Sequence, residues 1–198
     1  MTIAHYFTFL RIFISPIFLL IYLYPKSFGL EPISLSIVLF ILLAISELSD
    51  AIDGYIARRF NQVTELGKIL DPMADSIYRI SLFLTFTQDP VKLPMVLVFV
   101  FLYRDSVIST LRTICALKGF TLAARPSGKI KAAIQGLAAA IVILLMFLIA
   151  INFISPDQLT SYSTAVVSAA ALYTVLSGVD YVVSNWKYIR RLLKIKRA

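Results

Sequence analysis

Residues 50–75 read DAIDGYIARRFNQVTELGKILDPMAD and join two strongly apolar segments of the chain. Four aspartates stand in this stretch, Asp50, Asp53, Asp71 and Asp75. Ionisable side chains at membrane depth are costly unless they are paired or bind a ligand, so they mark functional sites. Because these four acids have no local excess of bases beside them, the stretch predicts a cation site.

The composition of the whole chain is that of a membrane protein. Its 198 residues are 59% hydrophobic and 15% charged, and the mean hydropathy is +0.85. Crossing a bilayer takes about 20 apolar residues in a helix. We therefore predict an all-α polytopic membrane protein, a single domain over residues 1–198, with six transmembrane helices. The predicted spans are 7–25, 33–57, 67–88, 92–117, 130–154 and 158–184.

The distribution of lysine and arginine predicts the orientation. Among the residues at the span ends and in the connections, twelve Lys and Arg fall on one side and only Lys26 and Lys92 on the other. Such an asymmetry places the basic side, and with it both termini, in the cytosol. A net charge of +8 at that face favours anionic lipid head groups or phosphorylated substrates as partners. Nucleic acid is a poor candidate, because the bases lie at loop and helix ends.

The spacing of the aspartates predicts that they converge. Asp50 and Asp53 are three residues apart, and Asp71 and Asp75 are four apart, so each pair shares one face of a helix. The short link 60–65 makes the two helices antiparallel neighbours, which brings all four carboxylates together below the cytosolic interface. Oxygen ligands suit Mg²⁺ or Mn²⁺, and four carboxylates could hold two ions about 4 Å apart. The absence of His and Cys from the cluster argues against zinc.

Three small residues, Gly54, Ala57 and Gly67, face or flank the predicted cluster. Small residues in membrane helices commonly serve close helix packing, which is the simpler interpretation of each glycine alone. Their fixed spacing to the four acids and to Arg58 favours ligand contact. Arg58 is the predicted phosphate partner, because a guanidinium group can bind phosphate through two hydrogen bonds.

The pattern D-x2-D-G-x2-A-R-x8-G-x3-D-x3-D in this stretch resembles the signature of the CDP-alcohol phosphotransferase family at all eight specified positions. Further along, YRDSVISTLR and GFTLAARPSGKIKAAIQG are similar to stretches of the bacterial phosphatidylglycerolphosphate synthases within that family. There are departures from the subgroup. His5 stands where Asn is expected, Ser76 follows Asp75 in place of Lys, and Asp105 replaces Glu in an Arg-Glu pair.

The resemblance implies a six-helix homodimer in the bacterial cytoplasmic membrane, with its active site facing the cytosol. It implies transfer of a phosphatidyl group from CDP-diacylglycerol to sn-glycerol 3-phosphate, with release of CMP. Carried over by position, the metal ligands would be Asp50, Asp53, Asp71 and Asp75, with Asp75 also the general base. The residues lining the CDP site would be Gly54, Ala57, Arg58 and Gly67.

A phosphorylated acceptor needs bases on the cytosolic side, and a second group of residues could supply them. These candidates are Arg104, Arg112, Arg125, Lys129 and Lys131. We also expect Lys129 to lie at a helix start, where Ser127 and Gly128 leave backbone N–H groups free for an anion. The alternative interpretation of the group is a charge-paired helix end together with ordinary orientation-setting bases.

Competing functions remain open at this point. A cation transporter would also place carboxylates in a membrane, but it predicts acids spread through the depth rather than gathered at one face. Among enzymes, the same transfer to inositol phosphate, inositol or serine is the alternative. The tail 187–197 reads as a basic amphipathic helix on anionic lipid. Asp180 is expected to pair with a base that the sequence does not identify.

Overall fold

The structure is a computed structural model that describes residues 3–59, 65–117, 119 and 125–194. Within these ranges the only regular secondary structure is helical, as predicted. The helices are α1 (Ile3–Leu23), the short 3₁₀ helix η1 (Pro25–Phe28), α2 (Pro32–Arg59), α3 (Glu65–Thr85), α4 (Met95–Leu117), α5 (Pro126–Ala150), α6 (Pro156–Ser184) and α7 (Trp186–Lys194). Each of the six windows predicted as spans overlaps one of the helices α1–α6.

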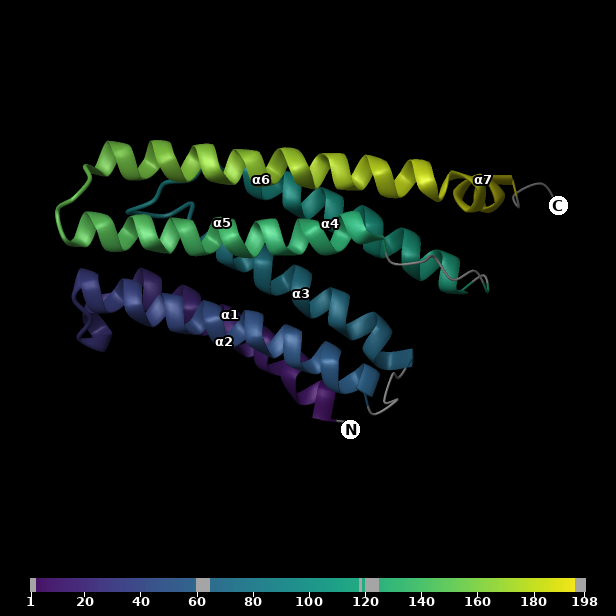
Figure 1. The fold of residues 1–198 in the computed structure, drawn as a ribbon, viewed down its shortest axis with the longest axis horizontal. Helices are drawn as coiled ribbons and strands as arrows, with labels where there is room; N and C mark the ends of the chain where they lie inside the picture. Colours follow the sequence, from purple (N-terminus) through teal and green to yellow (C-terminus); the bar gives the residue numbers. More distant parts are fainter. Residues whose placement is uncertain (1–2, 60–64, 118, 120–124, 195–198) are drawn as a thin grey trace.

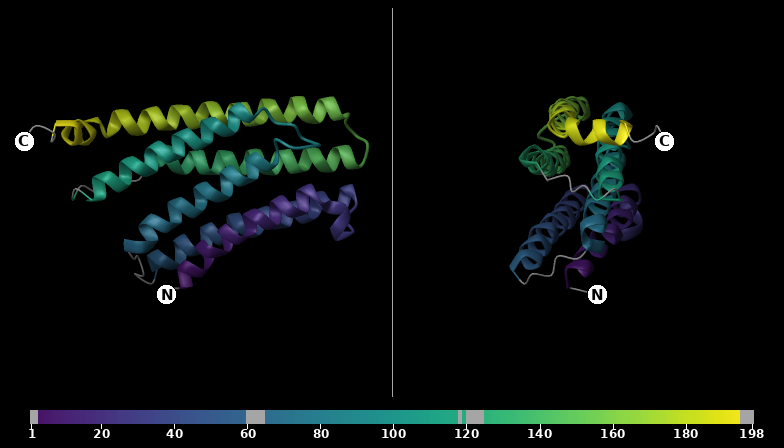
Figure 2. Two further views of the ribbon diagram at one scale, coloured as in Figure 1. Left: turned by 180° about the vertical axis from the view of Figure 1, so that it is seen from behind. Right: turned by 90° about the vertical axis from the view of Figure 1, so that its right-hand side faces the viewer.

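The long helices form an elongated bundle (Figure 1). The helices α5 and α6 pack side by side, as do α1 and α2, while α3 and α4 run obliquely between these pairs (Figure 2). The contacts of α3 with α1 and α4, of α4 with α6, and of α2 with α5 close the bundle. One end of it gathers the last turns of α2, α4 and α6 and the first turns of α3 and α5 (Figure 1). All of the predicted site residues belong to these turns or lie near them.

Three helical segments of the described chain are long and apolar enough to cross a membrane, namely Pro32–Asp50, Pro126–Ala150 and Pro156–Ser184. A shorter apolar segment, Phe9–Leu23, lies in α1. The helices α3 and α4 are interrupted by charged residues, which lowers their hydropathy where the predicted site lies. Length and composition therefore support three of the six predicted spans.

The outer surface of the bundle is rich in large apolar side chains. Val96 and Tyr103 on α4 are each 66% exposed, and Leu137 on α5 and Leu172 on α6 are each 63% exposed. A water-soluble monomer seldom exposes contiguous apolar surface on this scale. The outward faces of these helices are therefore suited to contact with lipid.

An aromatic cluster joins the oblique helices to α1. Phe86, just beyond α3, meets Phe18 of α1 edge to face at 5.9 Å, and Phe83 of α3 lies 4.7 Å from Phe101 of α4, both measured between ring centroids. All four rings are buried. Aromatic pairs in these arrangements add to the free energy gained from burial alone, so the cluster fixes α3, the helix that carries two of the aspartates.

The last helix turns away from the bundle axis. Asn185 ends α6, and its side-chain amide donates a hydrogen bond to the carbonyl of Tyr181 at 2.8 Å. Seen from the end of the bundle, α7 lies across the direction of α6 (Figure 2). The predicted C-terminal helix is confirmed over residues 186–194, and residues 195–198 lie outside the described part of the chain.

Candidate active site

A cavity of about 270 Å³ lies at the end of the bundle where α2 ends and α3 and α5 begin. Its lining includes three predicted metal ligands and all five predicted acceptor-phosphate residues: Asp50, Asp71, Asp75, Arg104, Arg112, Arg125, Lys129 and Lys131. The carboxylates come from α2 and α3, and the cations come from α4, α5 and the residue before α5. Two groups of residues that are far apart in the sequence therefore line one cavity.

The other predicted site residues lie on the same two helices. The backbones of Asp53, Gly54, Ala57 and Arg58 belong to α2, and that of Gly67 belongs to α3. Their side chains lie outside the described part of the structure. The metal and nucleotide roles assigned to these five residues remain predictions.

Asp50 is held from the neighbouring helix. The guanidinium group of Arg11 on α1 forms a hydrogen-bonded ion pair with the Asp50 carboxylate, and the Arg11 side chain is only 1% exposed. Because a buried charge must be paired or bound to a ligand, Arg11 ties α1 to the site. The sequence analysis assigned Arg11 no role at the site.

Asp75 is held by a residue that sequence reasoning missed. Nε of Arg79, one turn further along α3, donates a hydrogen bond to Oδ1 of Asp75 at 2.8 Å. The other edge of the same guanidinium faces Glu47 on α2, with Nη1 3.1 Å from Oε1 and Nη2 3.3 Å from Oε2. The four-residue spacing to Asp75 could have identified Arg79. No spacing identifies Glu47, which lies 32 residues earlier in the chain.

The carboxylate oxygens of the acidic wall, the part of the cavity lined by Asp50, Asp71 and Asp75, suit a hard divalent cation as ligands. Asp50, Asp71 and Asp75 all open onto the cavity, and carboxylate oxygens are what Mg²⁺ prefers. Among the described side chains, no three His, Cys, Asp or Glu residues are already drawn together around one point. Asp53 is not among those side chains, so the predicted four-carboxylate arrangement stays a prediction.

The cations of the opposite, basic wall differ in their hydrogen-bond partners; they are Arg104, Arg112, Arg125, Lys129 and Lys131. Nζ of Lys131 donates to both carboxylate oxygens of Asp105, at 2.8 and 2.9 Å, and Nη1 of Arg104 donates to Oδ1 of Asp105 at 2.9 Å. The side chain of Lys131 is 5% exposed and that of Asp105 is 4% exposed. Arg104 and Lys131 thus both form ion pairs with a largely buried carboxylate.

Arg125 forms a more exposed ion pair. It binds Asp180 of α6 through two hydrogen bonds, Nε to Oδ2 at 3.2 Å and Nη2 to Oδ1 at 3.0 Å, which identifies the partner of Asp180. Ser127 also donates to Asp180, at 2.6 Å. The Arg125 side chain is 39% exposed, and partly exposed ion pairs contribute little to stability. Arg125 can therefore exchange Asp180 for an anionic ligand at low cost.

Arg112 and Lys129 have no carboxylate partner among the described side chains. Nε of Arg112 donates to the hydroxyl of Tyr181 at 3.2 Å, and its guanidinium carbon lies 5.2 Å from the centre of that ring. A cation over an aromatic ring is stabilised without losing its charge. Lys129 is exposed at the start of α5. These two side chains offer positive charge that no described acid neutralises.

The prediction of a free N–H group at Gly128 is wrong. The backbone N–H of Gly128 donates to the carbonyl of Arg125 at 3.1 Å. The chain enters α5 through an extended Arg125 followed by Pro126, and a tight first turn then satisfies one of the N–H groups that a helix start would leave open. Anion binding at this helix start rests on side chains rather than on that backbone group.

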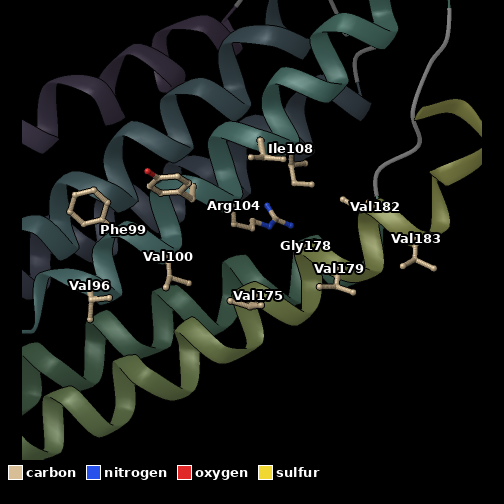
Figure 3. A pocket seen from close by; sticks show the side chains of 12 residues that line it. Val96, Phe99, Val100, Arg104, Ile108, Val175, Gly178, Val179, Val182 and Val183 are labelled. Carbon is tan, nitrogen blue, oxygen red and sulfur yellow. The ribbon is translucent and has the colours of Figure 1, made fainter. Parts of the chain in front are cut away.

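An apolar groove of about 560 Å³ runs between α4 and α6 next to the cavity (Figure 3). Arg104 and Ile108 line both spaces, so they form part of the wall between them. Figure 3 shows the Arg104 side chain extending toward α6 beside Gly178. A Cβ atom at Gly178 would lie 3.1 Å from Cγ of Arg104, so this glycine makes room for the arginine stem.

Comparison with known proteins adds independent information. A sequence model of the family described as CDP-alcohol phosphatidyltransferase matches residues 1–179. The chain is 33% identical to the CDP-diacylglycerol–glycerol-3-phosphate 3-phosphatidyltransferase of Bacillus subtilis over 191 residues, which cover 92% of this chain and 94% of the relative. It is 31% identical to the enzyme of the same name from Rickettsia typhi over 144 residues, 72% of this chain and 76% of the relative.

A relative with a different name matches a shorter part of the chain. The cardiolipin synthase (CMP-forming) of Streptomyces coelicolor is 34% identical over 108 residues, which cover 54% of this chain and 48% of the relative. This match covers smaller shares of both chains than the matches to the two 3-phosphatidyltransferases.

Proposed function

The chain belongs to the CDP-alcohol phosphatidyltransferase family, and we propose that it transfers a phosphatidyl group from CDP-diacylglycerol to sn-glycerol 3-phosphate. The products would be phosphatidylglycerol phosphate and CMP. Relatives that bear the name of this activity match over most of their own length. The observation that carries the proposal is a single cavity with carboxylates on one wall and cations on the other.

The acidic wall suits the donor. We propose that Asp50, Asp53, Asp71 and Asp75 hold one or two Mg²⁺ or Mn²⁺ ions. Such ions neutralise a pyrophosphate and stabilise the phosphate that leaves. We further propose that Gly54, Ala57, Arg58 and Gly67 contact the cytidine diphosphate, an assignment that rests on their positions in the family signature.

The basic wall suits the acceptor. We propose that Arg112 and Lys129 bind the phosphate of glycerol 3-phosphate, and that Arg125 joins them by leaving Asp180. Arg104 and Lys131 would then attract the phosphate through their charge without contacting it, because both are already bound to Asp105. The difference in pairing refines the five-residue prediction into three direct contacts and two supporting cations.

Asp75 is the proposed general base. An alcohol is a weak nucleophile at neutral pH and reacts faster when a positioned side chain accepts its proton. In the proposed reaction, the acceptor hydroxyl loses its proton to Asp75 as its oxygen bonds to the β-phosphorus of the donor. The bond from that phosphorus to the oxygen bridging to the α-phosphorus breaks, and CMP leaves with the electron pair. Asp75 lines the same cavity as the cations proposed to bind the acceptor.

The apolar helices and bacterial relatives support an integral membrane protein. We propose six spans, cytosolic termini, a location in the bacterial cytoplasmic membrane and a cavity open to the cytosol. The supporting observation is that the site residues gather at the basic end of the bundle (Figure 1). A single catalytic domain over residues 1–198 and a homodimer are further proposals, the dimer on the strength of the family resemblance; the mass of the protein in detergent micelles tests the dimer.

The test of function is CMP release by the purified protein. CDP-diacylglycerol is supplied in mixed micelles with Mg²⁺, and glycerol 3-phosphate, inositol phosphate, inositol and serine are compared as acceptors. We expect rapid release with glycerol 3-phosphate only, and almost none from Asp75→Asn. Faster release with another acceptor would transfer the proposal to that alcohol. A wild-type protein that releases no CMP but transports Mg²⁺ across the membrane of lipid vesicles would support the transporter alternative.

A further inference from the structure

Asp75 uses its two carboxylate oxygens differently. Oδ1 accepts the hydrogen bond from Nε of Arg79 at 2.8 Å, whereas Oδ2 accepts none from the described residues. The Asp75 side chain is about one quarter exposed and borders the cavity. The carboxylate is therefore anchored at one oxygen and open at the other.

Arg79 is itself anchored on the side away from the cavity. Its side chain is 5% exposed, and both of its terminal nitrogens face the carboxylate of Glu47 on α2. Because the guanidinium group is planar and rigid, two contacts at one edge fix the direction of the Nε–H at the other edge. The direction of the hydrogen bond to Asp75 is thus determined by α2.

Glu47 is confined by α5. A Cβ atom at Gly136 would lie 3.1 Å from carboxylate atoms of Glu47, so the glycine allows the acid to lie against this helix. The same acid lines a groove of about 340 Å³ between α2 and α5. The order Gly136, Glu47, Arg79, Asp75 is a continuous set of contacts from one surface groove to the catalytic cavity.

We propose that Arg79, held by Glu47, is a positioning residue that fixes Oδ1 of Asp75 and so presents Oδ2 to the acceptor hydroxyl. The inference rests on the proposed function, because it concerns the carboxylate assigned as general base. It assigns a role in the reaction to two charged residues that lie outside the cavity lining. Arg79 acts through Asp75 and does not touch substrate.

The experiment compares Arg79→Gln, Arg79→Lys, Glu47→Gln and the double variant of Glu47→Gln with Arg79→Gln in detergent micelles. The double variant matters because Arg79→Gln alone leaves Glu47 charged and without its cation. Thr174→Val is the matched control, since it removes the partner of a buried interhelical hydrogen bond, Gln135 Nε2 to Thr174 Oγ1 at 3.1 Å, away from the cavity. For each protein we would measure kcat, both KM values, Mn²⁺ binding by electron paramagnetic resonance, and the unfolding midpoint.

We expect kcat of Arg79→Gln and of the double variant to fall about ten- to a hundredfold, the range for losing one charge-assisted hydrogen bond. The KM for CDP-diacylglycerol should stay near the wild-type value, and Mn²⁺ should still bind. The double variant should have a higher unfolding midpoint than Arg79→Gln, and its kcat should remain as low as that of Arg79→Gln. Arg79→Lys should recover much of kcat, Glu47→Gln should lose less than Arg79→Gln, and Thr174→Val should keep kcat.

A wild-type kcat in the double variant would overturn the inference. An equal fall in kcat for Thr174→Val would do the same, because it would trace the effect to loosened packing. Loss of Mn²⁺ binding in the double variant would overturn it too, because Arg79 would then maintain the site rather than orient one carboxylate. A wild-type protein that releases no CMP with any acceptor overturns the proposed function itself, and the inference with it.

Discussion

Neutralising Arg112 should weaken the acceptor and spare the donor. Arg112 lines the cavity and has no carboxylate partner among the described side chains; its contacts are the hydroxyl and the ring of Tyr181. Its full charge is therefore available to a phosphate. A hydrogen bond to a charged group contributes about 1.5–3 kcal/mol. Arg112→Gln should accordingly raise the KM for glycerol 3-phosphate by about ten- to a hundredfold.

The assay is steady-state CMP release with one substrate varied while the other is saturating. The KM for CDP-diacylglycerol should remain within about a factor of two, because uniform loss of acceptor binding does not alter the donor site. Tyr181→Phe is the matched control. It removes the hydroxyl that contacts Arg112 and keeps the ring beneath the guanidinium, so it should change the acceptor KM far less.

Two results would refute this reasoning. A rise confined to the KM for CDP-diacylglycerol would show that Arg112 serves the nucleotide or the lipid. Equal effects of Arg112→Gln and Tyr181→Phe on the acceptor KM would show that Arg112 matters only through its contact with Tyr181. In either case the phosphate would have to bind Lys129 and Arg125 without Arg112.

Three further changes test the surrounding structure. Asp105→Asn leaves Lys131 and Arg104 without their buried carboxylate, so the free energy of unfolding in detergent should fall by about 3–5 kcal/mol. Its control, Asp89→Asn, removes an acid from the exposed pair with Lys92 and should leave the unfolding curve unchanged. Equal effects of the two substitutions would contradict an energetic difference between buried and exposed ion pairs. Asp71→Asn, or excess chelator added to the wild type, should abolish most CMP release, and full turnover in either would exclude the metal site. Gly178→Ala should fail to stabilise the protein despite a helix-propensity gain of about 1 kcal/mol, because its Cβ would lie 3.1 Å from Arg104; a raised unfolding midpoint would contradict this.

The features that could be predicted from sequence are those that depend on local periodicity. The helices follow from apolar windows, and Asp71 and Asp75 share a face because they lie four residues apart. The basic wall could be predicted because Arg104 and Arg112 interrupt a helix that is otherwise apolar, where an unpaired charge is costly. The cavity lining confirms that these residues are close together, while their roles stay predictions.

The ion-pair partners could not be predicted in the same way. Asp180 pairs with Arg125 across 55 residues, and Asp50 pairs with Arg11 across 39. Such pairs depend on how the helices pack, and the sequence alone offers several bases for each acid. Asp105 illustrates the same point, since it contacts both its neighbour Arg104 and the distant Lys131.

The pairing of charges bears on which acceptor the cavity selects. Positive charge at membrane depth is costly unless it is paired, and Asp105 pairs with both Arg104 and Lys131, which leaves one net positive charge in that group of three. Arg112 is only partly exposed and has no described carboxylate partner, so a neutral acceptor such as inositol would leave its charge without a counter-ion in the cavity. In the proposed binding mode, a phosphorylated acceptor supplies that counter-ion. The proposed binding mode thus favours a phosphorylated alcohol over a neutral one, because only the phosphate balances the charge of Arg112.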